Sequence, residues 1–179
     1  MLKQGSFDKL TGLTLGTYRL EQFVGQGKTG PIFLARTDAT TTYVIHFLIG
    51  SMSPTVKEQE LELERFQYQA SLIATLQHPH ILPLLDFGVY RGLPYLVSPH
   101  IPLRPLRTRI AKNGVLDTLT VGRYLDQIAT ALEYAHAHSV LHGNLSVDSV
   151  FLRLDGQLIV ADIGVRSLLE QDAPGTQFP

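Results

Sequence analysis

The chain has no cysteine and no tryptophan, and it carries little charge for its length. The absence of cysteine excludes disulfides, thiolate zinc sites and cysteine nucleophiles. Its 15 Lys and Arg residues nearly balance 16 Asp and Glu residues, a formal net charge of −1. This balance gives no electrostatic reason to expect nucleic acid or an anionic membrane surface as a partner, and we expect neither.

Long apolar runs are also missing. No window approaches the ~20 apolar residues that a membrane span needs, and the first residues contain no apolar signal-peptide core. We therefore expect a cytoplasmic location by default. The chain does have 179 residues of which 44% are hydrophobic, enough for one globular domain or a piece of one and too apolar for a disordered chain.

The first half of the chain predicts a sheet and one helix. Residues 1–16 show no sustained period, which predicts a leader, with the domain beginning near Thr17. Segments 17–36 and 41–49 predict three short antiparallel strands, and segments 81–90 and 93–98 predict two more, joined by a turn at Arg91-Gly92. A helix is predicted over 57–77, with four residues on its apolar face: Leu63, Phe66, Ala70 and Ile73.

The second half predicts a helical block. Pro-rich residues 99–105 resemble a connector, and a helix is predicted over 120–139. A hairpin is predicted at Asp155-Gly156. The apolar stripe of the helix is expected to contain Val121, Leu125, Ile128, Leu132 and Ala135. Five strands and a helix followed by a helical block predict an α+β fold with two lobes.

Gly25-Gln26-Gly27-Lys28-Thr29-Gly30 forms a GxGxxG pattern between two predicted strands. The pattern alone is weak, because glycines also make tight turns. A Rossmann interpretation fails because the following segment predicts a strand, not a helix. A Walker A interpretation fails because Gln22 stands where the first glycine is needed.

A glycine loop between two strands is typical of protein kinases, and residues 17–176 resemble the bacterial serine/threonine kinase family with every element in order. YVIHFL resembles the third strand, ERFQYQASLIATLQHPHILPLLDFG helix C and the next strand, and PYLVSPHI the hinge. ATALEYAHAHSVLHGNLSVDSVFL resembles the catalytic-loop segment, and LIVADIGV the metal-binding segment. The resemblance implies an antiparallel five-stranded N-lobe sheet with helix C over 17–98, and the hinge with a partial C-lobe over 99–179.

The resemblance also implies sites for ATP and Mg²⁺. The metal position is Asp162. The nucleotide positions are Val24, Gly25, Gly27, Gly30, Ile32, Ser98, Pro99 and Ile101. For Val24 and Ile32 the alternative is a role as ordinary sheet residues. For Asp162 the alternative is a turn cap, although one carboxylate with phosphate oxygens can hold Mg²⁺.

Most of the catalytic residues of the family are replaced. His46 stands at the strand Lys, Gln69 at the helix C Glu and Asn144 at the catalytic Asp. Gly143, Ser146 and Ser149 replace the usual Arg, Lys and Asn of the catalytic loop. Because phosphoryl transfer needs the ion pair, the base and the metal ligands together, the sequence predicts a pseudokinase.

Three hypotheses stay open: a binding or scaffold module with a protein partner, a nucleotide-dependent switch with residual activity, and a remnant that does not fold alone. The kinase family also continues with further helices beyond the GT pair of QDAPGTQFP. The resemblance thus implies an incomplete C-lobe, explained by a cut chain, a gene remnant or completion by another chain. An exposed apolar patch is expected around Leu125 and Leu132.

Four other features have simple interpretations. Asp86-Phe87-Gly88 has the letters of a metal motif, but it precedes the hinge and is expected to be a turn. Lys28 is expected to be a solvated loop residue, with replacement of the strand Lys as the alternative. His136 and His138 are not expected to bind metal. The resemblance implies that His142 anchors the catalytic loop by a buried hydrogen bond.

Overall fold

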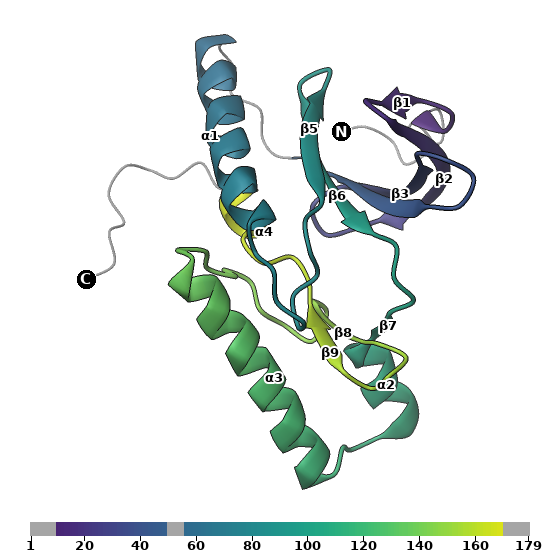
Figure 1. Ribbon diagram of the computed structural model, residues 1–179, viewed down its shortest axis with the longest axis vertical. Coiled ribbons are helices and arrows are strands. Elements are labelled where there is room, and N and C mark those ends of the chain that lie inside the picture. Colours follow the sequence, from purple (N-terminus) through teal and green to yellow (C-terminus); the bar gives the residue numbers. More distant parts are fainter. Residues whose placement is uncertain (1–9, 50–55, 170–179) are drawn as a thin grey trace. The chain divides into compact units, whose positions relative to one another are not determined.

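The computed structural model describes residues 10–49 and 56–169, which form two compact units. Unit 1 contains the described residues 10–49 and 82–102, and unit 2 contains 56–81 and 103–169 (Figure 1). The predicted domains 17–98 and 99–179 stay a prediction. The compact units are interleaved in the sequence, because the helix at 56–74 belongs with the C-terminal half.

Unit 1 is an antiparallel sheet of six strands in the order β1-β2-β3-β4-β6-β5. Its strands are β1 (Thr14–Leu15), β2 (Tyr18–Gln26), β3 (Pro31–Arg36), β4 (Thr42–Phe47), β5 (Asp86–Tyr90) and β6 (Leu93–Pro99). The hairpin predicted at Arg91-Gly92 is confirmed. Both turn residues have left-handed backbones, with φ of 49° and 80°, and this conformation suits a two-residue hairpin turn.

The period of two along β3 and β4 builds the core of unit 1. Phe33 and Ala35 point to the same side as Ile45 and Phe47 of the next strand, and all four are fully buried. The rings of Phe33 and Phe47 meet edge to face, with centroids 5.9 Å apart. The remaining buried members of this core are Leu15, Leu20, Tyr95 and Val97.

The predicted leader is wrong from residue 10 onward. β1 pairs with β2, Leu15 is buried, and Leu10 and Leu13 pack against the same core. These three leucines contribute apolar surface over a segment too short to show a period, which is why the sequence pattern did not reveal them. Residues 1–9 lie outside the described residues.

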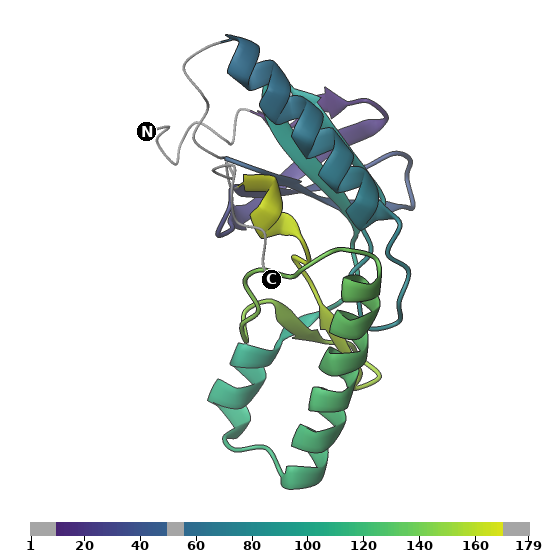
Figure 2. The same cartoon turned by 90° about the vertical axis from the view of Figure 1, so that its left-hand side faces the viewer.

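Unit 2 combines helices with a small antiparallel sheet of order β7-β8-β9 (Figure 2). The helices are α1 (Val56–Ala74), α2 (Leu106–Asn113), α3 (Thr118–Ala137) and α4 (Val165–Leu169), and the strands are β7 (Arg104–Pro105), β8 (Val150–Leu152) and β9 (Leu158–Val160). Leu106 of α2 joins Val150, Leu152 and Leu158 in one core, and Tyr124 and Ile128 of α3 pack against it. The hairpin predicted at Asp155-Gly156 joins β8 to β9 and is confirmed.

The predicted helix C is confirmed as α1, with Phe66, Ala70 and Ile73 buried and Leu63 half-buried. The helix predicted over 120–139 is confirmed as α3. Leu125 is 61% exposed and Val121 is exposed, as the expected apolar patch requires, whereas Leu132 is half-buried. The buried face is centred on Ala131 and Ala135, because small side chains let the helix approach its neighbours closely.

Three elements of unit 2 were absent from the sequence expectation: β7, α2 and the short helix α4. The expected connector 99–105 contains the two-residue strand β7, which pairs with β8. Helix α2 follows it, built largely from Arg, Lys, Ala and Leu, which favour helices without giving a clear apolar period. Among the described helices, none combines the length and the apolar character required to cross a membrane.

Candidate nucleotide site and catalytic loop

The glycine loop is a turn between β2 and β3 in which packing requires glycine at Gly30 but not at Gly25, where a Cβ would meet nothing within 4 Å. The Gly27 amide donates to the Gly30 carbonyl at 2.8 Å. A Cβ on Gly27 would lie 2.9 Å from Ile32 Cδ1, and one on Gly30 would lie 1.9 Å from the carbonyl oxygen of Phe47 on β4. The loop therefore rests directly on the backbone of the neighbouring strand.

His46 holds this loop from the position that the resemblance gives to the strand Lys. It lies on β4, where it pairs with Ile32 of β3 on one side and Leu96 of β6 on the other. Thr29 Oγ1 lies 2.7 Å from His46 Nε2, and the Ile49 amide donates to the Thr29 carbonyl at 2.7 Å. Two hydrogen bonds thus join the loop to β4 and the residues after it.

The candidate adenine residues lie on three elements of unit 1. Val24 on β2 is exposed, Ile32 on β3 is half-buried, and Ser98 and Pro99 pair with Val44 and Tyr43 across β4 and β6. Ile101 follows β6 and is half-buried. Pro99 has no N–H to offer a base. Their nucleotide role stays a prediction.

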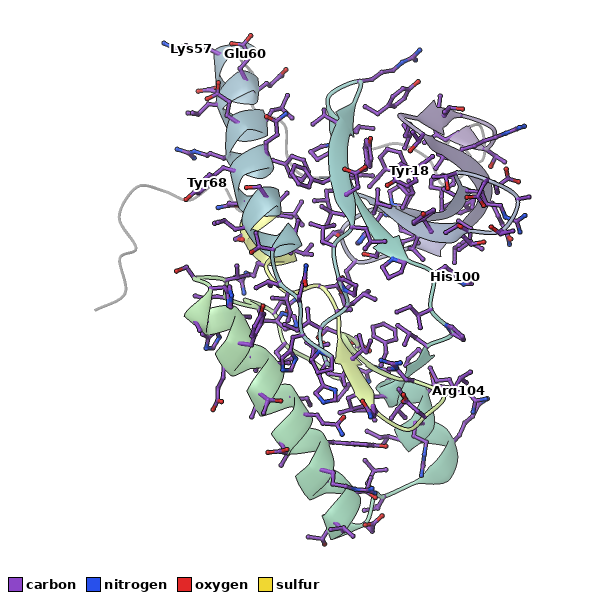
Figure 3. All side chains as sticks on the ribbon, viewed as in Figure 1. Tyr18, Lys57, Glu60, Tyr68, His100 and Arg104 are labelled. Atoms are coloured by element: carbon purple, nitrogen blue, oxygen red, sulfur yellow. The ribbon has the colours of Figure 1, made fainter. Side chains whose placement is uncertain are left out.

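Asp86-Phe87-Gly88 is not a turn, and that prediction is wrong. The three residues begin β5 and pair with Val97, Leu96 and Tyr95. Gly88 is needed there because a Cβ would lie 2.5 Å from Tyr95 Oη. Burial, followed by the Asp86 carboxylate, raises the pKa of Tyr18 to about 12 (Tyr18 is labelled in Figure 3). Asp86 thus belongs to a tyrosine-lined part of the sheet.

Ser146 and Ser149 are joined by two hydrogen bonds within the catalytic-loop segment of unit 2. Ser149 is 2% exposed. Its hydroxyl donates to the Ser146 carbonyl at 2.9 Å and accepts from the Ser146 amide at 3.1 Å. Asn144, at the position of the catalytic Asp, is exposed on the same segment. Ser149, at the position that the resemblance gives to the metal-binding Asn, therefore supports the loop backbone.

Asp162 follows β9 and has a left-handed backbone with φ of 61°. Few residues other than glycine adopt this conformation, and such positions cluster at functional sites. The Ala161 amide donates to the Ser149 carbonyl at 2.8 Å, which links the Asp162 turn to the catalytic-loop segment. The Asp162 side chain is exposed.

Arg166 on α4 covers Gly143, which stands at the position that the resemblance gives to the family's loop Arg. Arg166 Nη1 donates to the Gly143 carbonyl at 2.9 Å. Gly143 has φ of +73°, and a Cβ there would lie 3.2 Å from Arg166 Cβ. An arginine side chain therefore lies beside this position even though the sequence places a glycine in it.

The other candidate residues are more scattered. Gln69 is half-buried on α1, in unit 2, and Lys28 is exposed in the glycine loop. His136 and His138 are exposed, and the His138 ring Nδ1 lies 2.8 Å from the Tyr134 carbonyl. His142 is 4% exposed, and its anchoring role stays a prediction. Over 10–49 and 56–169, no group of three potential metal ligands occurs.

Sequence reasoning missed Thr29 and Arg166. Thr29 occupies a variable position of the glycine pattern, and only the register that sets Ile32 opposite His46 brings the two together. Arg166 lies 23 residues from Gly143 along the chain, and no local pattern joins them.

The described residues fit only a reduced magnesium site. A kinase holds its magnesium ions with two protein ligands of different type, an Asp and an Asn. The Ser149 hydroxyl is engaged with Ser146, so Asp162 is the single candidate ligand of these two positions.

The chain is similar to known kinases over nearly its whole length. A family model described as "Protein kinase domain" matches residues 18–178. The kinase domain of Mycobacterium tuberculosis PknI is 25% identical with a TM-score of 0.72, and the match covers 87% of this chain and 62% of that domain. The two-lobe kinase fold expected from the sequence, with a partial C-lobe, is thereby confirmed.

Two curated proteins illustrate the sequence similarity. A probable serine/threonine-protein kinase KIN1 homolog of Enterocytozoon bieneusi is 26% identical over 93% of this chain and 27% of its own length. Aurora kinase B of Mus musculus is 28% identical over 90% of this chain and 46% of its own length. The chain thus spans about a quarter to a half of these relatives, and with the family model matching most of its length it belongs to the protein kinase family.

Proposed function

We propose that the chain is a pseudokinase, a kinase-shaped binding or regulatory module that does not transfer phosphate. The observation that carries this proposal is the hydrogen bond between His46 and Thr29. The side chain at the Lys position is bonded to the glycine loop of its own chain. An imidazole there does not provide the fixed ammonium that contacts the nucleotide phosphates in the family.

The catalytic loop supports the same proposal. Asn144 cannot accept the proton of an attacking hydroxyl, and loss of a general base costs roughly 10²–10⁴ in rate. Ser149 bonds to Ser146 in place of the family's metal-binding Asn. Gln69 supplies no carboxylate for an ion pair.

The test measures folding, binding and turnover of the same preparation. Thermal unfolding is followed with and without excess ATP and Mg²⁺, and transfer of labelled γ-phosphate to casein and to the chain itself is assayed in parallel. We expect a cooperative melt and no transfer above a blank. Transfer that is lost in Asn144→Ala would contradict the proposal, and a chain without a cooperative melt would favour the remnant hypothesis.

A nucleotide-dependent switch is the second candidate, favoured by the left-handed backbone of Asp162. The glycine loop and the hinge residues of unit 1 would then be the candidates for ATP, and Asp162 of unit 2 the candidate for Mg²⁺, the ligands that the kinase family generally uses. A ligand at 100 times its dissociation constant stabilises a fold by roughly 2.7 kcal/mol. This candidate predicts a magnesium-dependent rise in melting temperature that Asp162→Ala abolishes and Asp155→Ala, in the exposed β8–β9 turn, leaves unchanged.

A module without turnover acts through what it binds, so we propose a protein partner. The expectations of no nucleic-acid partner and no membrane partner, and of a cytoplasmic location, stay predictions from the sequence.

A further inference from the structure

Three exposed aliphatic residues lie in the turn between α2 and α3 or within one turn of it on these helices. Val115, in the turn, is 98% exposed, Leu119 in the first turn of α3 is 73% exposed, and Ile110 on α2 is also exposed. We call these three residues the α2–α3 tip. Figures 1 and 2 show both helices running to this one short turn. Aliphatic groups gathered on a surface in this way are a common mark of a binding site.

The tip is held in shape by caps on both helices. Gly114 ends α2 with φ of 74°, and its amide donates to the Ile110 carbonyl at 2.9 Å. Asp117 caps α3, since its carboxylate accepts from the Thr120 amide at 2.9 Å and from the Thr120 hydroxyl at 2.7 Å. Val115 therefore lies in an ordered turn between two capped helices, so little conformational entropy is lost when it is buried by a partner.

The segment around the tip is strongly basic although the whole chain is not. Residues 104–123 contain five Lys or Arg and one Asp, whereas the rest of the chain contains 10 basic and 15 acidic residues. Arg107 pairs with Asp148, and Arg123 donates to the Thr120 hydroxyl at 3.3 Å. Arg104, labelled in Figure 3 where β7 leads into α2, and Lys112 are exposed. This local charge is hidden in the net charge of −1.

We propose that the α2–α3 tip binds an acidic protein segment that carries aliphatic anchor residues. The exposed aliphatic groups would be buried by the anchors, and the surrounding cations would attract the carboxylates and speed association. The inference deepens the proposed function, because it rests on the chain acting as a protein-binding module and names the chemistry of the partner.

One feature favours a protein over an anionic membrane. Residues 104–123 contain no aromatic residue, whereas Trp and Tyr are the side chains enriched at membrane interfaces.

The test uses fluorescence anisotropy with a labelled peptide of alternating Glu and Leu pairs, and the same peptide with Lys in place of Glu as control. We expect the acidic peptide to bind the full chain, salt to weaken binding, and Val115→Asp to lower the affinity at least about tenfold. Leu154→Asp is the matched control, because Leu154 is 71% exposed on the β8–β9 turn. Lys112→Glu is expected to weaken binding more than Lys57→Glu on α1.

Several outcomes overturn the inference. They are equal binding by Val115→Asp and Leu154→Asp, a preference for the Lys peptide, and stronger Val115-dependent binding to phosphatidylserine–phosphatidylcholine vesicles. Self-association that Val115→Asp abolishes would likewise assign the tip to a second copy of the chain. Phosphate transfer in the turnover assay would refute the proposed function but would leave the peptide-binding results unchanged. Failure of the proposed function can therefore be distinguished from failure of the binding-site inference.

Discussion

Thr29 Oγ1 lies 2.7 Å from His46 Nε2, so the glycine loop is bonded to the side chain at the position that the resemblance gives to the strand lysine. The Ile49 amide adds a second bond to the Thr29 carbonyl. In the family this lysine contacts nucleotide phosphates. Here the loop and the strand contact each other.

Removing this contact should loosen the loop. Thr29→Val keeps the shape of the side chain and deletes the hydroxyl, so we expect the free energy of unfolding to fall by about 1 kcal/mol. Thr29→Ser keeps the hydroxyl and should retain most of the stability. The measurement is a urea titration followed by circular dichroism. Identical midpoints for the Val and Ser variants would show that the bond contributes nothing.

Gly30 provides a test of whether the loop glycines serve packing. A Cβ there would lie 1.9 Å from the Phe47 carbonyl oxygen, and backbone cannot yield as a flexible side chain can. We expect Gly30→Ala to lower the free energy of unfolding by roughly 1–3 kcal/mol in the absence of any nucleotide.

The matched control is Gly122→Ala in α3, where a Cβ would meet nothing within 4 Å. Alanine in an exposed helix is better than glycine by roughly 0.5–1 kcal/mol, so this variant should be more stable than the parent. Both variants are compared in the same urea titration. If Gly30→Ala were as stable as the parent, the requirement for glycine would have to come from a ligand.

The Asp117 cap makes the α2–α3 tip sensitive to acid. Hydrogen bonds from the Thr120 hydroxyl and amide lower the pKa of the Asp117 carboxyl below its ordinary value of 3.8. The cap is therefore complete above that ordinary value, and its contribution is lost as the pH falls through the lowered pKa. Asp117→Ala should lower the stability at neutral pH and remove this part of the acid dependence.

Asp117→Asn is the control, because Asn caps helices without titrating. It should keep the stability at neutral pH and show a weaker loss in acid than the parent. Chemical shifts of the Thr120 amide, followed by NMR from neutral pH downward, report the cap directly. An unchanged Thr120 titration in the Asn variant would contradict the assignment.

The sequence predicts the elements of the fold better than the faces they bury. The alternation of Phe33, Ala35, Ile45 and Phe47 marks two strands because burial there follows the period of two. The sequence pattern also predicts helix α3, but not that its buried face contains Ala131. Close packing there requires small side chains, and these contribute little to an apolar pattern in the sequence.

Some candidate site residues can be predicted from the sequence pattern, whereas the contacts between others depend on the fold. Gly25, Gly27 and Asp162 are found by their place in a family pattern. The bond from Thr29 to His46 depends on strand register, and the contact of Arg166 with Gly143 depends on how α4 folds back. The sequence contains the residues of both contacts but not the geometry that joins them.

The Arg166–Gly143 contact predicts that the family's arginine cannot simply be restored. Gly143 has φ of +73° and its Cβ position lies 3.3 Å from Arg166 Cδ. A side chain in this left-handed conformation costs roughly 1–2 kcal/mol, and it would also collide with Arg166. We expect Gly143→Arg to be clearly destabilised in a urea titration.

Removing the neighbour should recover part of that loss. Arg166→Ala deletes the crowding atoms beyond Cβ, so the pair Gly143→Arg and Arg166→Ala should be more stable than the sum of the single effects by roughly 0.5–3 kcal/mol. The left-handed backbone at residue 143 remains, which prevents full recovery. A double-mutant cycle measures the coupling, with Ser167→Ala replacing Arg166→Ala as the control on α4. The Ser167 hydroxyl donates to the Gly164 carbonyl, so the effects of Gly143→Arg and Ser167→Ala should be additive. Coupling of equal size in both cycles would mean that Arg166 has no specific interaction with the catalytic loop.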